Sequence, residues 1–287
     1  MNRTHIALAV LTTAIWGSNF VAIKIGLAGF PPFLFTALRF GLSALPFLLI
    51  YRHPGTAWKW VIGMGLALGV GQFGLLFWAM QLGMPAGLSS AVLQTQVFFT
   101  LLFSLLLGER PNRRQLAGMS LAFCGVLVIA GDLAGGSLPA FLMLIAAAAC
   151  WAFANILTRL ARAPNALRLM TWVSVVPVLP MLLLSWAVEG KARILFSLTH
   201  LGWHSLAALA YVSFGATLVG YGLWSHLLKL YPARIVAPYS LLVPLFGLST
   251  AALMLHENPG PQKLAGAALI ILGVAANSWP QRKAGTA

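Results

Sequence analysis

The sequence predicts an all-α integral membrane protein with ten transmembrane helices, arranged as two inverted five-helix repeats with both termini in the cytoplasm. Three observations support this prediction. The composition is 60% hydrophobic and only 8% charged, apolar runs long enough to cross a bilayer recur along the chain, and one ten-residue phrase occurs twice. No polar stretch is long enough to solvate a separate globular domain, so the composition is that of a membrane protein.

The apolar runs are about 17 to 25 residues long, the length that crosses a bilayer as a helix. They lie near residues 6–27, 31–51, 60–82, 85–107, 113–131, 138–160, 168–188, 206–229, 232–255 and 261–280. A buried soluble core is the alternative, but it would need polar helix faces, and segments such as AVLQTQVFFTLLFSLLLG offer almost none. The first run resembles a signal peptide in following Arg3, but it is long and no prompt cleavage site follows, so we expect a retained helix.

The first three spans place polar and aromatic residues near mid-depth, judged by a rise of about 1.5 Å per residue. Trp16 and Asn19 share a face of the first span, and Gln72 and Phe77 lie on the third. Arg39 lies inside the second span, where a charge costs about 2.5 to 3.5 kcal/mol on insertion scales. No acidic residue lies at its depth, so we expect it to bind either helix-end carbonyls or the carboxylate of a substrate.

The fourth to sixth spans repeat this pattern. The fourth opens with Pro85-Ala86 and carries Gln94 near its middle, whereas the fifth is apolar. In the sixth span Trp151 and Asn155 are four residues apart and therefore share a face.

The last four spans contribute aromatic residues and prolines. The eighth contains Tyr221, Trp224 and His226, and His226 is the one histidine well inside a predicted span, which makes it a candidate proton site. In the ninth, Pro238 and Pro244 remove backbone donors and favour a kink, with either a structural or a functional purpose.

The repeated phrase reads ERPNRRQLAG at 109–118 and ENPGPQKLAG at 257–266. The similarity continues downstream, where Gly118 and Gly125 match Gly266 and Gly273, and Trp16 in the first half matches Trp151 in the second. Each half holds five spans, and an odd number forces the second half into the membrane upside down. The sequence therefore predicts two inverted repeats, residues 1–134 and 135–287.

The charge distribution gives the orientation. With a cytoplasmic N-terminus, the basic residues on the inner side are Arg3, Arg52, Lys59, Arg110, Arg113, Arg114, Arg159, Arg162, Arg168, Lys229, Arg234, Arg282 and Lys283, against Lys191, Arg193 and Lys263 outside. This positive-inside bias places both termini in the cytoplasm. The net charge of +14 thus reports orientation, and we expect the lipid bilayer and no nucleic acid as partner.

Inverted repeats are typical of secondary transporters, whose halves enclose a site near the bilayer midplane. A channel is the competing transport class, but no span carries a ring-forming run of carboxylates and no loop resembles a filter. An enzyme is the competing chemical class. The sequence contains no HExxH, no GxSxG and no Cys/His cluster with metal spacing, so we expect no catalytic residue, metal or cofactor.

Several motifs together resemble one family. IWGSNFVAIKIGL, Arg39-Phe40, GMPAGLSSAVLQTQVFFT, GER followed by QLAG, and VGYGLW followed by APYSLLVPLFGL resemble the EamA-type transporters of the drug/metabolite transporter superfamily. Within it the chain is similar to bacterial exporters of amino acids and their metabolites, particularly of the O-acetylserine/cysteine type. The resemblance implies ten helices, cytoplasmic termini and a cavity built mainly from helices 1, 3, 4, 6, 8 and 9.

We therefore expect an inner-membrane secondary exporter of small amphipathic metabolites, most simply amino acids, working by alternating access. A passive channel or facilitator, or a carrier of drugs or nucleotide sugars, is the alternative. The candidate substrate-binding residues are Trp16, Asn19, Gln72, Phe77, Gln94, Trp151, Asn155, Tyr221 and Trp224, with Arg39 as charge partner and His226 as proton site. For the tryptophans, asparagines and glutamines near mid-depth, the alternative role is core packing or an interhelical hydrogen bond. For Phe77, Tyr221 and Trp224, which lie nearer helix ends, it is a place in the interfacial aromatic belt.

Overall fold

The computed structural model describes residues 1–105, 113–131, 138–231, 236, 239–240, 242–258 and 260–278, and these residues form helices and no strand. Five helical segments in this part are long and apolar enough to cross a membrane: Arg3–Gly26, Trp58–Gln81, Leu138–Ala161, Ala166–Glu189 and Trp203–Trp224. Pro32–Leu48, Leu116–Ile129 and Leu242–Leu255 are shorter apolar helices. The protein is an all-α membrane protein.

The first half contains helices interrupted by changes of helical type. Its elements are α1 (Arg3–Gly26), α2 (Pro32–Leu48), the continuous span α3 (Trp58–Gly65), η1 (Leu66–Gly74) and α4 (Leu75–Gln81), then α5 (Ala86–Val92), η2 (Leu93–Thr95), α6 (Gln96–Leu105) and α7 (Arg113–Gly131). Among these η1 is a π-helix and η2 a 3₁₀ turn. Asn2 caps α1 by accepting a hydrogen bond from the His5 amide.

The described residues of the second half of the chain are also helical. Its described elements are α8 (Leu138–Ala161), the span α9 (Ala166–Val175), α10 (Val178–Leu184) and η3 (Ser185–Glu189), α11 (Lys191–Thr199), the span α12 (Trp203–Ala210), η4 (Tyr211–Gly220) and α13 (Tyr221–Leu230), then α15 (Leu242–Leu255) and α16 (Gly260–Ser278). Here η3 and η4 are π-helices. Asn165 caps α9 through the Arg168 amide.

The described helices lie within a few residues of the expected spans, with two differences. First, α11 is an additional helix at Lys191–Thr199, where the sequence analysis placed only a connection. It is too short to cross a bilayer, and it exposes Leu195 and Phe196 at the end of the bundle. Second, residues 232–235, 237–238 and 241 of the expected span 232–255, Pro238 among them, lie outside the described residues, and α15 covers the last 14 residues of that span. Pro244 is buried in α15.

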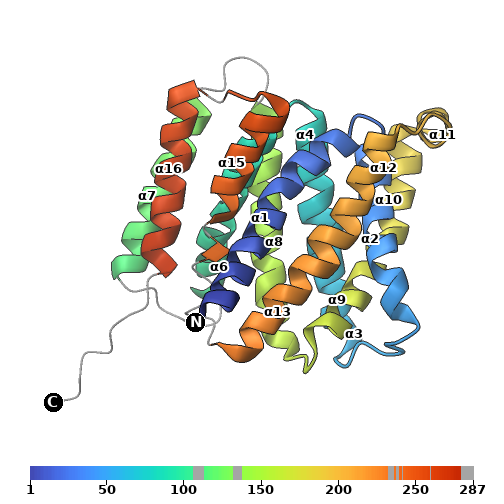
Figure 1. Ribbon diagram of the computed structural model, residues 1–287, viewed down its shortest axis with the longest axis horizontal. Coiled ribbons are helices and arrows are strands. Elements are labelled where there is room, and N and C mark those ends of the chain that lie inside the picture. Colours follow the sequence, from blue (N-terminus) through green and yellow to red (C-terminus); the bar gives the residue numbers. More distant parts are fainter. Residues whose placement is uncertain are drawn as a thin grey trace.

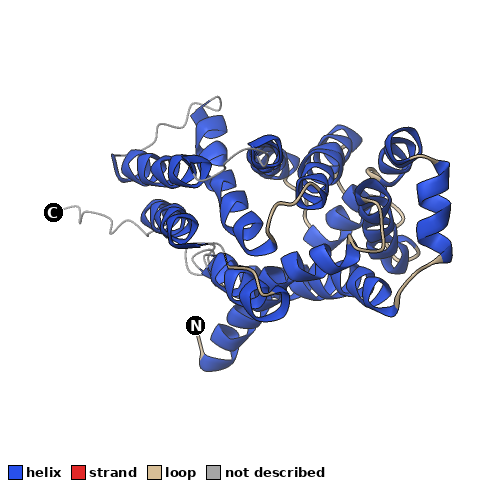
Figure 2. Ribbon diagram, turned by 90° about the horizontal axis from the view of Figure 1, so that it is seen from above, coloured by secondary structure: helices blue, strands red, loops and turns tan. Residues whose placement is uncertain are grey.

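The helices run between two ends of the bundle (Figure 1). The starts of α1, α3 and α9 and the ends of α8 and α13 lie at the lower end of that view. The ends of α1 and α4, the start of α12 and helix α11 lie at the upper end. Figure 2 shows the bundle turned by 90°. α7 and α16 form an outer pair at one edge, and the rest packs around a core cluster that includes Phe35, Phe77 and Leu144.

Glycines allow α7 and α16 to touch along their backbones. A Cβ atom at Gly125 would lie 2.5 Å from the carbonyl oxygen of Gly266, and one at Gly273 would lie 2.5 Å from that of Gly118. Only residues without side chains permit this approach. These four glycines are the ones that match between the two halves of the sequence. Gly118 of the first pair contacts Gly273 of the second, and Gly125 contacts Gly266.

Two carboxylates hold helix starts at the upper end. The Glu189 carboxylate accepts hydrogen bonds from the amides of Phe33 (2.6 Å) and Leu34 (3.2 Å) at the start of α2. The Glu257 carboxylate accepts from the amides of Ala86 (2.8 Å) and Gly87 (3.0 Å) at the start of α5. Both carboxylates satisfy amides that have no partner within the helix and lie at its positive end.

Candidate functional site

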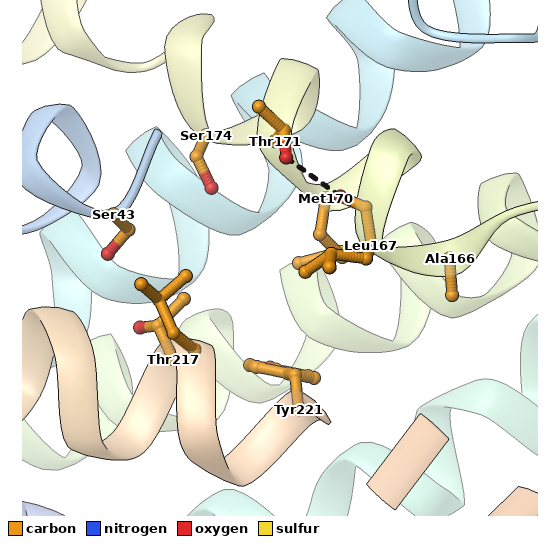
Figure 3. Close-up of a pocket in the computed structure, with 9 residues that line it drawn as sticks. Ser43, Ala166, Leu167, Met170, Thr171, Ser174, Thr217 and Tyr221 are labelled. Carbon is orange, nitrogen blue, oxygen red and sulfur yellow. Dashed lines mark hydrogen bonds between the residues drawn. The ribbon is translucent and has the colours of Figure 1, made fainter. Parts of the chain in front are cut away.

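A narrow pocket opens between α2, α9 and the span formed by η4 and α13 (Figure 3). The space in it that a water-sized molecule can enter is about 20 Å³, room for about one water molecule in this state. The pocket is lined by Ser43, Ala166, Leu167, Met170, Thr171, Ser174, Thr217, Leu218 and Tyr221. α2 belongs to the first half of the chain and the other helices to the second. The pocket therefore lies between the two halves.

Hydroxyl groups give the pocket its polarity. The Ser43 hydroxyl donates to the carbonyl oxygens of Arg39 (2.7 Å) and Ser213 (3.0 Å). The Thr171 hydroxyl donates to the Leu167 carbonyl (2.8 Å), and the Thr217 hydroxyl donates to a carbonyl of its own π-helix (3.0 Å). Because each hydrogen is used by the backbone, the oxygen lone pairs remain to accept hydrogen bonds from a bound group.

Arg39 lies one helical turn from Ser43 along α2 and is buried, with 3% of its surface exposed. Its guanidinium carbon lies 3.8 Å from the centre of the Phe73 ring, a cation–π contact. Nε and Nη1 are buried without a hydrogen-bond partner. Each buried donor without a partner lowers the stability of the folded state by about 1 to 3 kcal/mol, and by more when the group is charged. The first alternative from the sequence, a bond to helix-end carbonyls, is therefore not made by these two nitrogens.

Three of the predicted aromatic residues meet beside the pocket. The ring of Trp16 lies 5.2 Å from the rings of Tyr221 and Trp224, measured between centres. Its indole N–H donates to the Ala216 carbonyl in η4 (3.0 Å). Tyr221 also lines the pocket, so it connects this aromatic cluster to the polar space. This hydrogen bond joins Trp16 to a π-helix, and π-helices are frequent at functional sites.

The other predicted residues lie apart from the pocket lining. Asn155 donates from its amide to Gln96 Oε1 (2.8 Å) and to the Thr100 hydroxyl (3.3 Å) on α6. Gln94 is buried in η2, one 3₁₀ turn before α6. Trp151 packs at the border of two apolar clusters.

Asn19, Gln72, Phe77 and His226 have different surroundings. The amide oxygens of Asn19 and Gln72 are buried without a partner. Phe77 is fully buried against Phe35 and Phe73. His226 is an exposed residue of α13, and its ring centre lies 6.0 Å from that of His5 near the lower end of the bundle.

Sequence reasoning missed Ser43, Thr171, Ser174 and Thr217. A signal existed, because Leu167, Met170, Thr171 and Ser174 follow i, i+3, i+4, i+7 spacing and so share a face of α9. Arg39 and Ser43 are likewise one turn apart. The resemblance implied a cavity from helices 1, 3, 4, 6, 8 and 9, whereas this pocket lies between the second, seventh and eighth. α1 packs directly on η4 through Trp16, which fills the space on that side.

A second pocket is wholly apolar apart from one threonine and lies between α6, α7 and α8. It is lined by Thr95, Phe98, Phe99, Ala122, Phe123, Val126 and Ile145. Such a lining offers nothing to a zwitterion or an anion. Within the described parts of the chain, no group of three or more His, Cys, Asp or Glu side chains could hold a metal ion.

Comparisons with known proteins identify the family. The chain matches the EamA-like transporter family twice, over residues 3–131 and 138–279. It is 41% identical to a Salmonella typhimurium protein named "Probable amino-acid metabolite efflux pump", across 100% of this chain and 99% of that protein. It is 39% identical to an Escherichia coli protein of the same name, across 98% and 97%. One crystal structure, 21% identical, shares the fold with a TM-score of 0.63 over 96% of both chains. The chain therefore belongs to the EamA-like transporter family, and it is a transporter, not an enzyme.

Proposed function

We propose that this inner-membrane protein exports amino acids or their small derivatives, and that it does so by alternating access through the pocket between α2, α9 and α13. One observation carries the proposal. A chain that is 41% identical over its whole length to a protein named as an amino-acid metabolite efflux pump places a hydroxyl-lined pocket between its two halves. A site between two similar halves is where secondary transporters bind their substrates.

The proposal includes two inverted halves, residues 1–134 and 135–287, with five spans each. The crosswise contacts of Gly118 with Gly273 and of Gly125 with Gly266 support it. When two matching elements are related by a two-fold axis, the first residue of one contacts the second residue of the other, and the reverse contact also occurs. The π-helices η1 and η4 lie in the third and eighth spans, which correspond in this scheme.

The proposal also places both termini in the cytoplasm. At the lower end of Figure 1, where α1 begins and α16 ends, lie Arg3, Arg52, Lys59, Arg159, Arg162 and Arg168, whereas the upper end carries Lys191, Arg193 and Lys263. A positive excess marks the cytoplasmic side. Ala166, at the start of α9, is the pocket residue nearest the lower end. The pocket would therefore receive substrate from the cytoplasm.

Within this site, the rings of Trp16, Tyr221 and Trp224 form an apolar wall, and the hydroxyls of α2, α9 and η4 bind polar groups. Such a division suits substrates that share polar ends and differ in side chain. Asn19 and Gln72 remain in the proposal because a buried amide oxygen without a partner is expected to gain one, from substrate or water, in another state of the cycle. In that other state we also predict substrate contacts for Gln94, Trp151, Asn155 and Phe77.

Counterflow in liposomes tests the proposal. The purified chain is reconstituted into vesicles loaded with unlabelled L-cysteine, and uptake of labelled L-cysteine is followed under reducing conditions. A carrier gives saturable uptake that exceeds equilibrium and then declines, whereas a channel gives none of this overshoot. The same assay is repeated with O-acetyl-L-serine and L-leucine, and with glucose and UDP as non-amino-acid probes. Absence of counterflow for all three amino-acid probes would contradict the proposed function.

A further inference from the structure

Arg39 lies on α2, the helix that contributes Ser43 to the pocket lining. It precedes the pocket residue Ser43 by four residues on α2, so the two side chains leave the same face of the helix. Because α2 runs from the upper to the lower end of the bundle (Figure 1), Arg39 lies one helical turn nearer the upper end than Ser43.

The surroundings of the guanidinium leave its hydrogen bonds unmet. The Phe73 ring covers one face of the group at 3.8 Å, so only the edges of its plane can donate. A carboxylate docks in two-point fashion on the Nε/Nη2 edge or the Nη1/Nη2 edge. Both edges include a nitrogen that is buried without a partner, since Nε and Nη1 have none.

The chain offers no described carboxylate to this cation. Glu189 and Glu257 are the acidic residues of the described ranges, and both are bound to helix starts at the upper end. A buried cation without an internal counterion favours an anion from outside. The hydroxyl oxygens of Ser43, Thr171 and Thr217 are neutral acceptors, which can bind an ammonium group but do not require one.

We propose that Arg39 recognises the free carboxylate of the substrate, and that the transporter therefore selects carboxylates while tolerating loss of the amino group. This inference rests on the proposed function, because it assigns a substrate group to the same pocket. It makes Arg39 a specificity-determining residue. A carboxyl group converted to an amide would leave the guanidinium without its anion, whereas removal of the ammonium would cost only contacts with neutral oxygens.

Competition binding with three matched compounds tests this selection. Labelled L-cysteine is bound to the purified full-length chain in detergent and is displaced by S-methyl-L-cysteine, by the amide of S-methyl-L-cysteine, or by 3-(methylthio)propanoate. The second compound lacks the carboxylate and the third lacks the ammonium group. We expect the first and third to compete within about tenfold of each other and the amide to compete at least tenfold more weakly than the first. Equal competition by amide and acid would overturn the proposal.

Substitutions at Arg39 assign the selection to this side chain. In Arg39→Gln, the affinities for S-methyl-L-cysteine and its amide are expected to lie within about twofold of each other. Arg39→Lys keeps the charge but not the planar guanidinium, so it should retain part of the difference. Arg52→Gln, at an exposed arginine beyond the end of α2, should keep the full difference. If Arg39→Gln folds and keeps the wild-type ratio, Arg39 has a structural role only. Counterflow by the wild type decides the proposed function separately, whatever the ratio.

Discussion

Gly220 is the residue that lets the Trp16 ring lie against the pocket span. A Cβ atom at this position would lie 2.5 Å from the indole nitrogen, which donates to the Ala216 carbonyl. Gly220→Ala must therefore displace the ring from Tyr221 and break this hydrogen bond. We expect the substitution to lower the initial rate of amino-acid counterflow several-fold. Its effect on stability combines a gain in helix propensity with a steric strain of about 1 to 3 kcal/mol, which opposes that gain.

Gly222→Ala is the matched control, because it adds the same methyl group two residues later, where no atom lies within 4 Å. It should keep normal transport and unfold at the same or a higher temperature, since alanine favours helix by about 1 kcal/mol over glycine. Thermal unfolding and counterflow are measured for both variants. Indistinguishable behaviour of the two would show that the position of Trp16 does not matter for transport.

Among the elements, α5 depends on a carboxylate from a distant part of the chain. Glu257 accepts hydrogen bonds from the amides of Ala86 and Gly87, whose positions leave them without partners inside the helix. Glu257→Ala should lower the free energy of unfolding by about 1 to 3 kcal/mol. Glu257→Gln, which keeps one acceptor oxygen, should lose less, and Gln81→Ala, at an exposed position of the same end, should change little.

The Gln variant also tests energy coupling. Glu189 and Glu257 are held by helix starts and not by the pocket, so neither is placed to carry a proton through the midplane. Folded Glu257→Gln and Glu189→Gln proteins are therefore expected to transport at rates near wild type. Loss of transport in either variant, with substrate binding kept, would identify a coupling carboxylate at the outer end.

For the whole molecule, the proposed inverted arrangement predicts that two similar segments lie on opposite sides of the membrane. Arg113 begins α7 at the lower end and Asn258 precedes α16 at the upper end. After replacement of the free cysteines Cys124 and Cys150, single cysteines are introduced as Arg113→Cys or Asn258→Cys. An impermeant thiol reagent applied to intact cells should label the second variant alone. Labelling of Arg113→Cys in intact cells, to the extent seen after lysis, would contradict the cytoplasmic placement of the first segment.

Sequence alone predicted the family, and it predicted the described helices other than α11 to within a few residues, because hydrophobic length and helix starts are local properties of the chain. Trp16, Tyr221 and Trp224 were predicted together and do meet beside one pocket. The hydrogen-bond partner of Asn155 was not predicted. Asn155 donates to Gln96, and the 3₁₀ turn at Leu93–Thr95 changes which side chains follow the helix face.

Tertiary structure decided which helices enclose the pocket, what Glu189 and Glu257 bind, and how Arg39 is surrounded. The composition of each span shows that a residue is buried, but not against which helix, because nearly every face of these spans is apolar. Rotation of a span about its axis is set by the neighbours that fit it, such as Phe73 over Arg39 or the backbone contact of Gly125 with Gly266. These contacts join residues far apart in sequence, so only the packed molecule defines them.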